Sequence, residues 1–213
     1  MLTPLPDILC YQEIPDTYAN NISIIPPGYR SVYAPAWMKK GIMYGQLTAY
    51  NPNTVSFQLN RIVNLGTSIW ERKLFRQTGE RTGLLTLFES GGHLFNIINI
   101  HLVCLARNKT RRNQLNQIIE SLNDHTTPTI IVGDYNYSNI LQWRRLRSYM
   151  MKRGFIQAGS SHNTHRLLFL NHQLDYAFHR NCEIHSVTVG ERVYSDHAPL
   201  FVHFDHITPP AIV

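Results

Sequence analysis

The sequence predicts a single α+β domain in which strands outnumber helices. Most of the first half of the chain forms short runs rich in β-branched and aromatic side chains, separated by Pro, Gly and Asn. Two later segments repeat apolar residues with the period of an amphipathic helix. The chain of 213 residues is long enough to bury a core, and no repeat, linker or low-complexity tract divides it. We therefore expect one domain over residues 1–213.

Strands are expected first along the chain. Four runs have the composition of half-buried strands, at residues 7–14, 30–36, 41–50 and 54–63. A hairpin is expected over residues 82–103. Its turn is Gly91-Gly92, because glycines adopt the positive φ angles that a two-residue turn requires.

Two amphipathic helices are expected in the second half. Residues 108–125 repeat apolar side chains at i, i+3, i+4 and i+7 from Leu115, and the pattern stops before Pro128. Residues 138–155 repeat the pattern, with Gly154 near the expected helix end.

The composition favours a soluble protein with an anionic partner. Lys and Arg outnumber Asp and Glu by 20 to 14, which suits a nucleic acid or a phospholipid surface, although a charge that only keeps the protein soluble explains the excess equally well. The 3 cysteines are far apart, so no disulfide framework is indicated. The N-terminus lacks the basic region of a secretory signal, and no apolar run approaches the roughly 20 residues of a membrane span. We expect a cytoplasmic location, with export by a signal-less route left open.

Polar side chains recur at the ends of expected strands. Asp134 and Asn136 follow a buried run, and their spacing of two predicts that both lie on one face as the strand ends. Glu13 and His101 end two earlier runs, and Asp175 begins a later one. Any one of these has a structural explanation as a turn former, a cap or a buried histidine. Their recurrence favours an active site where a rigid sheet meets its loops.

Five segments, in this order, carry a family resemblance: DILCYQEI, INIHLV, IVGDYN, QLDYAF and YSDHAPL. Together, from Asp7 to Phe204, they resemble the endonuclease/exonuclease/phosphatase family, the deoxyribonuclease I and exonuclease III-like metal-dependent phosphoesterases. The resemblance implies a four-layer sandwich of two mixed β-sheets flanked by helices. It also implies hydrolysis of phosphate esters with Mg²⁺ or Mn²⁺.

The resemblance assigns a role to each polar residue. Glu13 is expected to bind the metal, as an oxygen ligand suited to Mg²⁺, and Asp196 to point towards it. Asp134 is expected to orient or deprotonate the attacking water, and Asn136 to hold that water or a phosphate oxygen.

The remaining roles concern histidines. His197 is expected to face the phosphate, and Asp175 to accept a hydrogen bond from it and fix its tautomer. His101 resembles a second histidine that clamps phosphate or protonates the leaving group. Whether Asp134 or His197 takes the proton of the water is left open.

One departure from the family pattern concerns the first strand. Family members begin with a strand that ends in an asparagine, which supports the metal-binding glutamate. Here only six residues precede the strand that carries Glu13. We expect the usual first strand to be missing, to be replaced by another segment or a partner chain, or to be lost through a start codon assigned too late.

The sequence also contains two histidine pairs and two basic clusters. The histidine pairs His162/His165 and His203/His206 lack a cysteine or carboxylate that would complete a zinc pattern, so we interpret them as surface histidines. Two basic clusters follow His101 and Asn136 and are expected to contact phosphates of a nucleic acid. They contain Arg107, Lys109, Arg111 and Arg112, and then Arg144, Arg145 and Arg147.

Three functions remain open at this point. The leading hypothesis is a nuclease or other phosphodiesterase acting on DNA or RNA. The alternative is a phosphatase or phospholipase C-type enzyme acting on inositol-phosphate or sphingomyelin headgroups. A non-enzymatic binding domain on the same fold is the third.

Overall fold

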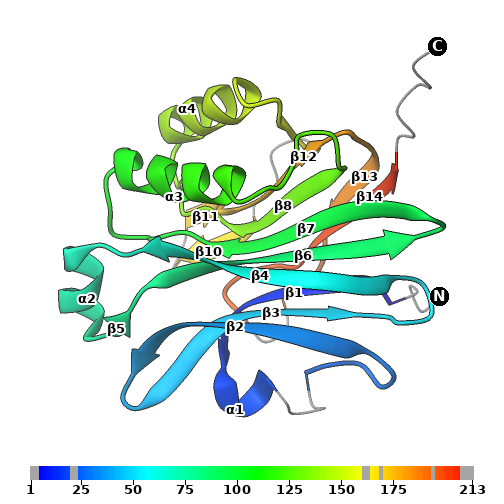
Figure 1. Cartoon of the computed structure of the whole chain (residues 1–213). Helices are drawn as coiled ribbons and strands as arrows, with labels where there is room; N and C mark the ends of the chain where they lie inside the picture. Colours follow the sequence, from blue (N-terminus) through cyan, green and yellow to red (C-terminus); the bar gives the residue numbers. More distant parts are fainter. Residues whose placement is uncertain (1–4, 20–23, 160–163, 168–169, 193–194, 207–213) are drawn as a thin grey trace.

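Two β-sheets stack face to face in the centre of the molecule, and helices lie on their outer sides (Figure 1). The structure is a computed structural model that describes residues 5–19, 24–159, 164–167, 170–192 and 195–206. The four-layer sandwich expected from the sequence is confirmed.

The larger sheet is mixed and has six strands. Its order is β4-β6-β7-β8-β12-β9, where β7 and β8 are parallel and every other pair is antiparallel. Parallel neighbours require a crossover connection, and helix α3 supplies it. The strands are β4 (Ser56–Gly66), β6 (Arg81–Ser90), β7 (His93–His101), β8 (Thr129–Asp134), β12 (Asp175–Arg180) and β9 (Ile156–Gln157).

The second sheet has four antiparallel strands in the order β1-β3-β2-β5. Within the described residues, β1 lies at the edge of this sheet and pairs only with β3. The strands are β1 (Ile8–Pro15), β3 (Ile42–Tyr50), β2 (Arg30–Lys39) and β5 (Thr78–Gly79).

Two small antiparallel pairs complete the strands. β13 (Cys182–Val189) pairs with β14 (Leu200–His206), and β10 (His165–Leu167) pairs with β11 (Leu170–His172). The β10–β11 pair lies just before β12 along the chain, and an isolated backbone bridge joins His165 of β10 to His197.

The helices cover the outer faces. Helices α3 (Asn108–Glu120) and α4 (Ile140–Met151) lie over the larger sheet, and α1 (Asp16–Ala19) lies under the smaller one (Figure 1). Helix α2 (Ile69–Phe75) was not expected from the sequence, and Ser68 caps its N-terminus by accepting a hydrogen bond from the Glu71 amide. None of the helices in the described segments is long and apolar enough to cross a membrane.

Three layers of buried side chains separate the four layers of backbone. Leu115 and Ile118 of α3 pack with Ile98 and Ile100 beneath the helices. Between the sheets, a second cluster is built around Phe88, with partly buried side chains from β1, β13 and β14 around it. A smaller third cluster, around Leu47 and Ala49, lies on the outer side of the smaller sheet. This rigid double sheet positions the residues described next.

Candidate active site

Three of the expected site residues form one row across adjacent strands. His101 ends β7 and is the register partner of Asp134, which ends β8. Asp134 is in turn the register partner of Asp175, which begins the antiparallel strand β12. Because parallel strands end at the same edge of a sheet, the ladder itself brings together an imidazole and two carboxylates. All three residues are buried.

The close approach of β7 and β8 depends on Gly133. A Cβ atom at this position would lie 1.9 Å from the carbonyl oxygen of Ile100, and the residue has a φ of +139°. Any side chain at position 133 would therefore separate the strands just before His101 and Asp134. The glycine sets the spacing of the row.

Asn136 reaches the site through a turn rather than through strand alternation. β8 ends at Asp134, and Asn136 has a left-handed φ of 56°. Its amide N–H donates to Asp134 Oδ1 (2.7 Å), and its side-chain Nδ2 donates to the Leu102 carbonyl (2.9 Å). We expected strand alternation to place both side chains on one face. Asn136 does lie beside Asp134, but an Asx-type turn after the strand places it there.

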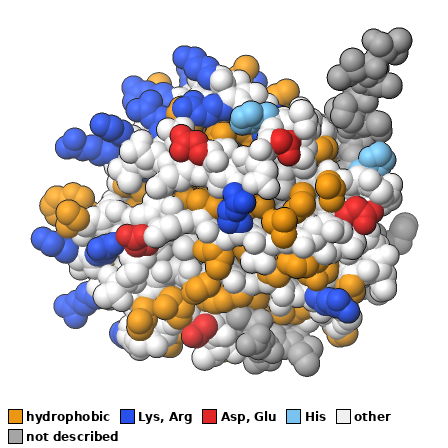
Figure 2. All heavy atoms as spheres, viewed as in Figure 1, with side chains coloured by type: hydrophobic (Ala, Val, Ile, Leu, Met, Phe, Trp, Pro, Cys, Tyr) orange, Lys and Arg blue, Asp and Glu red, His pale blue; other side chains and the backbone are white. Residues whose placement is uncertain are grey.

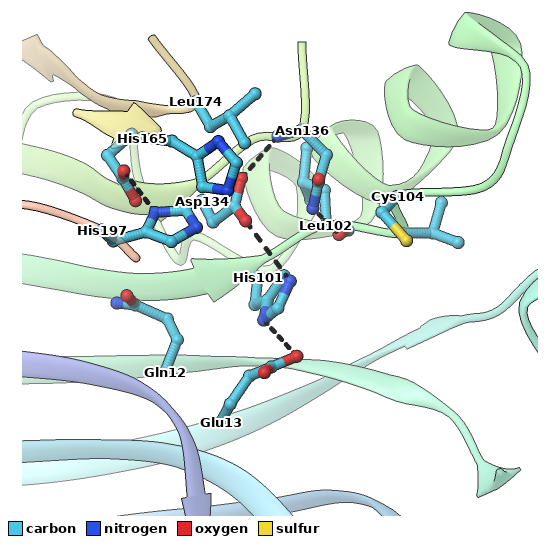
Figure 3. Close-up of polar contacts among 12 residues, drawn as sticks. Gln12, Glu13, His101, Leu102, Cys104, Asp134, Asn136, His165, Leu174 and His197 are labelled. Atoms are coloured by element: carbon cyan, nitrogen blue, oxygen red, sulfur yellow. Dashed lines mark hydrogen bonds and ion pairs between the residues drawn. The ribbon is translucent and has the colours of Figure 1, made fainter. Parts of the chain in front are cut away.

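Glu13 lies on the opposite sheet and points towards the row. The pairing of β1 with β3 shifts register between Tyr11 and Ile14, and Glu13 in this bulge has a φ of 56°. Bulges redirect side chains, and strained backbone of this kind clusters at functional sites. In Figure 3, His101 stands between Glu13 and Asp134: its Nδ1 lies 3.7 Å from Glu13 Oε1, and its Nε2 lies 3.5 Å from Asp134 Oδ2.

A buried arginine also faces Glu13, and the sequence did not predict it. Arg81 begins β6 and forms a buried ion pair with Glu71 of α2. Burial acts to raise the pKa of Glu71, but the hydrogen bond and charge of Arg81 outweigh it, and the pKa is lowered. The other terminal nitrogen, Nη1, lies 3.7 Å from Glu13 Oε1 and has no hydrogen-bond partner among the described residues. Glu71 thus holds Arg81 against the base of the site.

His101 is held as a neutral imidazole. Burial and the positive charges of Arg81 and His197 lower its pKa well below the usual 6.5. Its Nδ1 atom is buried and has no hydrogen-bond partner within the part of the chain that the structure describes.

Asp134 titrates near neutrality. Burial, followed by the charge of Asp175, raises the pKa of Asp134 to about 7, against the opposing effects of His197 and the Asn136 amide. A carboxylate with such a pKa is suited to accept a proton at physiological pH.

His197 has the opposite character. Its Nδ1 lies 2.7 Å from Asp175 Oδ2. Burial acts to lower the pKa of His197, but the hydrogen bond and charge of Asp175, with the charges of Asp134 and Asp196, raise it to about 9. The residue is therefore an imidazolium at neutral pH, and the expected support from Asp175 is present in the structure.

Asp196 lies beside two histidines. In the described residues, the one set of three possible metal-ligand side chains that lie together is His165, Asp196 and His197. Asp196 Oδ2 lies 3.4 Å from His165 Nε2. The interpretation of His165 as a surface histidine was wrong, because only 9% of the residue is exposed. Its partner in that pair, His162, lies outside the described residues.

The chemistry around Glu13 suits a hard divalent cation. The carboxylate is 52% exposed, and the nitrogens of Arg81 and His101 that face it are 3.7 Å away, beyond hydrogen-bond length. Mg²⁺ retains several waters and often takes only one or two protein carboxylates. Glu13 is therefore free to act as such a ligand, and the residues present fit the metal.

The basic residues divide into two groups. Arg111 is buried, and its guanidinium donates to the carbonyls of Val103 and Cys104. The expectation that Arg111 contacts a nucleic acid was therefore wrong, because its donors stabilise the loop after β7. Arg112 and Arg145 instead line a hollow with Asn108.

The other basic residues lie on or beside α3 and α4, where Lys and Arg side chains gather on the surface (Figure 2). Arg144 and Arg147 border a second hollow along α4 with Trp143, and the Arg147 guanidinium lies 5.7 Å from the centre of the Trp143 ring. Arg107 immediately precedes α3. These positions leave the remaining five arginines of the expected clusters available as surface cations.

Arg81 and His165 were missed for different reasons. Arg81 stands alone before an apolar run, and its partner Glu71 lies ten residues earlier on a helix that periodicity did not indicate. His165 lies on a three-residue strand whose pairing with His197 comes from an isolated bridge between distant segments. A short sequence motif carries neither relationship.

Comparisons with known proteins support the fold. The profile of the Endonuclease/Exonuclease/phosphatase family matches residues 2–197. A UPF0294 protein of Vibrio vulnificus is 25% identical over 116 residues, which are 54% of this chain and 41% of that protein. The chain thus spans less than half the length of this relative.

Solved structures share the fold at low identity. D. rerio TDP2 complexed with single strand DNA product has a TM-score of 0.70 at 15% identity, covering 94% of this chain and 86% of that chain. A Bacteroides thetaiotaomicron mannosyl-6-phosphatase has a TM-score of 0.68 at 16% identity, covering 93% of this chain and 85% of that chain.

Proposed function

The chain belongs to the endonuclease/exonuclease/phosphatase family, and we propose that it is a Mg²⁺- or Mn²⁺-dependent phosphodiesterase acting on DNA or RNA. The observation that carries the proposal is that Asp134 and His197 both adjoin Asp175: Asp134 is its ladder partner, and His197 Nδ1 lies 2.7 Å from its Oδ2. Their pKa values, about 7 and about 9, provide a base and an acid at the same pH. Acid and base groups separated in this way are what hydrolysis by an attacking water requires.

Glu13 is the residue that would hold the metal ion. A bound divalent cation would neutralise phosphate charge and stabilise the developing charge of the transition state. Arg81 faces the same carboxylate from the protein interior, with its Nη1 atom 3.7 Å from Glu13 Oε1.

Asp134 acts as the general base in this proposal. Its Oδ1 is held by the Asn136 amide at 2.7 Å, which leaves Oδ2 as the oxygen closer to His101 and the site. The water that attacks phosphorus gives its proton to Asp134. Asn136 orients the water or a phosphate oxygen.

The two histidines differ in charge and therefore in task. His197, as an imidazolium, donates a hydrogen bond and positive charge to the phosphate or to the leaving oxygen. Asp175 keeps its ring in one orientation through Nδ1. Burial lowers the pKa of His101 and so favours its neutral form, which would donate one hydrogen bond and would not repel a cation held by Glu13.

The surface arginines favour a polyanionic substrate. Arg112 and Arg145 line one hollow on the helical side of the molecule, and Arg144 and Arg147 line another. Trp143 borders the second hollow and offers an aromatic face on which a base of a single strand would stack.

A substrate comparison tests the proposal. The purified protein would be assayed with Mg²⁺ and with Mn²⁺ against single-stranded DNA, duplex DNA and RNA, beside the Asp134→Asn variant. We expect metal-dependent cleavage of at least one nucleic acid, which the variant loses and EDTA abolishes. Binding without cleavage by the unmodified protein would instead favour a non-enzymatic binding domain.

One observation favours a lipid headgroup as a second candidate substrate. Helix α2 exposes three large apolar side chains, Ile69 (69%), Trp70 (73%) and Leu74 (68%), beside Arg72 and Lys73. A short apolar face with basic neighbours suits the interface of an anionic membrane.

Vesicles distinguish this second candidate from the first. Phosphoinositide and sphingomyelin vesicles would be added to the same assay, with co-sedimentation as the measure of binding. Cleavage of headgroups by the unmodified protein and weaker sedimentation of Trp70→Ala would favour the lipid candidate. Cleavage confined to nucleic acids would exclude it.

A further inference from the structure

His165 is a buried histidine that the proposed reaction does not use. It begins β10, and an isolated backbone bridge joins it to His197. The two imidazole rings are tilted at 60° with centroids 4.7 Å apart. Nε2 of His165 lies 3.4 Å from Asp196 Oδ2, and its buried Nδ1 has no hydrogen-bond partner among the described residues.

The three side chains converge on one point. One ligand atom from each of His165, Asp196 and His197 lies within 4.8 Å of the other two. Asp175 occupies Nδ1 of His197, which leaves Nε2 for a ligand. A carboxylate behind a histidine in this way is the usual support of a metal-binding imidazole, because it fixes the tautomer and the ring orientation.

We propose that His165, Asp196 and His197 form a binding site for a transition-metal ion such as Zn²⁺, and that its occupation inhibits phosphodiester hydrolysis. The inhibition rests on the proposed function, whereas the binding does not. Glu13 is not one of these three residues, and it offers a hard oxygen ligand suited to Mg²⁺.

The donor set determines which ion binds. Two imidazoles and one carboxylate suit Zn²⁺ and disfavour Mg²⁺, which prefers oxygen ligands. Ligand atoms in a tetrahedral zinc site are about 3.3 Å apart. The pair from His165 and Asp196 is already 3.4 Å apart, and the Asp196 side chain is 68% exposed, so it has room to adjust.

The inhibition follows from the shared nitrogen. His197 acts on the phosphate through the nitrogen that Asp175 does not hold. An ion bound to that nitrogen replaces its proton and removes the hydrogen-bond donor. A transition metal at this site therefore blocks the reaction even when Mg²⁺ is present.

A histidine replacement that preserves ring packing tests the binding. His165→Phe keeps a planar ring against His197 and removes both nitrogens. The matched control is His185→Phe, because His185 also pairs with a carboxylate (Asp205, 2.8 Å) and lies beside another histidine, on β13. Zn²⁺ binding would be measured by isothermal titration calorimetry on the full chain, with Co²⁺ absorption spectra as a second readout.

We expect one Zn²⁺ per chain in the unmodified protein and in His185→Phe. His165→Phe is expected to lose about 100-fold or more in affinity, since loss of a supporting group alone costs 10–100-fold. Should His165→Phe fail to fold by circular dichroism, Asp196→Asn on the exposed loop replaces it, with weaker binding expected. Absence of stoichiometric binding to the unmodified protein, or equal binding by His165→Phe, would overturn the site.

Activity decides the second half of the proposal. With Mg²⁺ held constant, added Zn²⁺ should inhibit the unmodified protein and His185→Phe, whereas His165→Phe retains its Mg²⁺-dependent activity and resists inhibition. Equal inhibition of His165→Phe would overturn the inhibitory role. If no substrate is cleaved, the proposed function fails while calorimetry still decides the metal site.

Discussion

Asp134 and Asp175 are direct partners in the ladder between β8 and β12, so the structure places two buried carboxylates opposite each other. The two carboxylates differ in their surroundings, because His197 Nδ1 lies 2.7 Å from Asp175 Oδ2. Burial, followed by the charge of Asp175, raises the pKa of Asp134 to about 7. Burial acts to lower the pKa of His197, but the hydrogen bond and charge of Asp175 raise it to about 9. Asp175 thus adjoins a base, Asp134, on the neighbouring strand and an acid, His197, at its side chain.

Asp175→Asn is expected to shift the pH dependence of catalysis towards acid. In the unmodified protein, kcat/KM rises as Asp134 loses its proton and falls as His197 loses its proton. Without the charge of Asp175 both pKa values fall, so both limbs of the profile move to lower pH. Profiles of kcat/KM with saturating Mg²⁺ measure the shift. A falling limb that stays in place would show that the His197 proton is not used.

The proton of His197 is also expected to make the free energy of unfolding depend on pH. The pKa of His197 is raised from the usual 6.5 to about 9 in the folded protein. Its contribution is therefore fully present below pH 6.5 and is lost as pH rises through about 9. Chemical denaturation would measure the free energy of unfolding at pH values between 6.5 and about 9. As pH rises over this range, Asp175→Asn should lose less of this free energy than the unmodified protein. NMR titration of the His197 ring provides an independent check.

Glu13→Gln is expected to abolish metal-dependent turnover with little effect on folding. The side chain is 52% exposed, so the neutral isostere removes the anionic ligand without disturbing a core. We expect kcat to fall by about 10²-fold or more, with a higher Mg²⁺ concentration needed for half-maximal activity. Glu80→Gln, on an exposed pair, is the control. Unchanged turnover at low Mg²⁺ would remove Glu13 from the metal site.

Asp134→Asn and His197→Ala should not be additive. If both act in one transition state, each alone costs several orders of magnitude in kcat, and the double variant loses little more than either single one. Single-turnover rates of the three variants measure the coupling. Losses that multiply would mean that the two residues act in different steps.

The buried ion pair between Arg81 and Glu71 gives a prediction about stability. Glu71→Gln leaves a buried guanidinium without its counter-charge, which we expect to cost about 3–5 kcal/mol in the free energy of unfolding. The double variant Glu71→Leu/Arg81→Met should be less destabilised than this, because no charge is left unpaired. For comparison, the exposed pair Arg72–Glu80 should contribute about 0–1 kcal/mol. Urea denaturation ranks these variants by their free energy of unfolding. A double variant less stable than Glu71→Gln would contradict the prediction.

Surface arginines should control the salt dependence of nucleic-acid binding. In an Asp134→Asn background, Arg112→Gln with Arg145→Gln should reduce the slope of log K against log salt by about 1–2 and weaken all sequences alike. Arg111→Gln should instead lower the melting temperature, because this guanidinium is buried and bonded to backbone carbonyls. A slope that is shallow for every nucleic acid would favour the lipid candidate.

Much of the site could be predicted because periodicity locates strand ends. The expected runs at residues 7–14 and 82–103 correspond to β1 and to the β6–β7 hairpin. A strand end fixes a residue at the edge of a sheet, so His101, Asp134 and Asp175 were correctly expected to lie together. The family resemblance supplied their roles and the arrangement of the sheets.

The remainder depends on relationships that no local pattern contains. The direction of Glu13 comes from a bulge with a left-handed φ, which composition does not indicate. Arg111 was expected at the surface with the other residues of its basic cluster, but it is buried. Its donors meet carbonyls of a loop that the helix pattern did not describe. His165 depends on the final fold to meet Asp196.

Substitution of Gly133 would reduce activity for a structural reason that a survey of substitutions would mistake for a catalytic one. Gly133 contacts no substrate in the proposed reaction, yet a single methyl group there would collide with the backbone at Ile100 and push His101 away from Asp134. A substitution scan scored only on turnover would therefore rank this position with the catalytic residues. A scan scored also on protein abundance would separate them, because a wedge between two core strands depletes the folded protein, whereas Glu13→Gln removes activity alone.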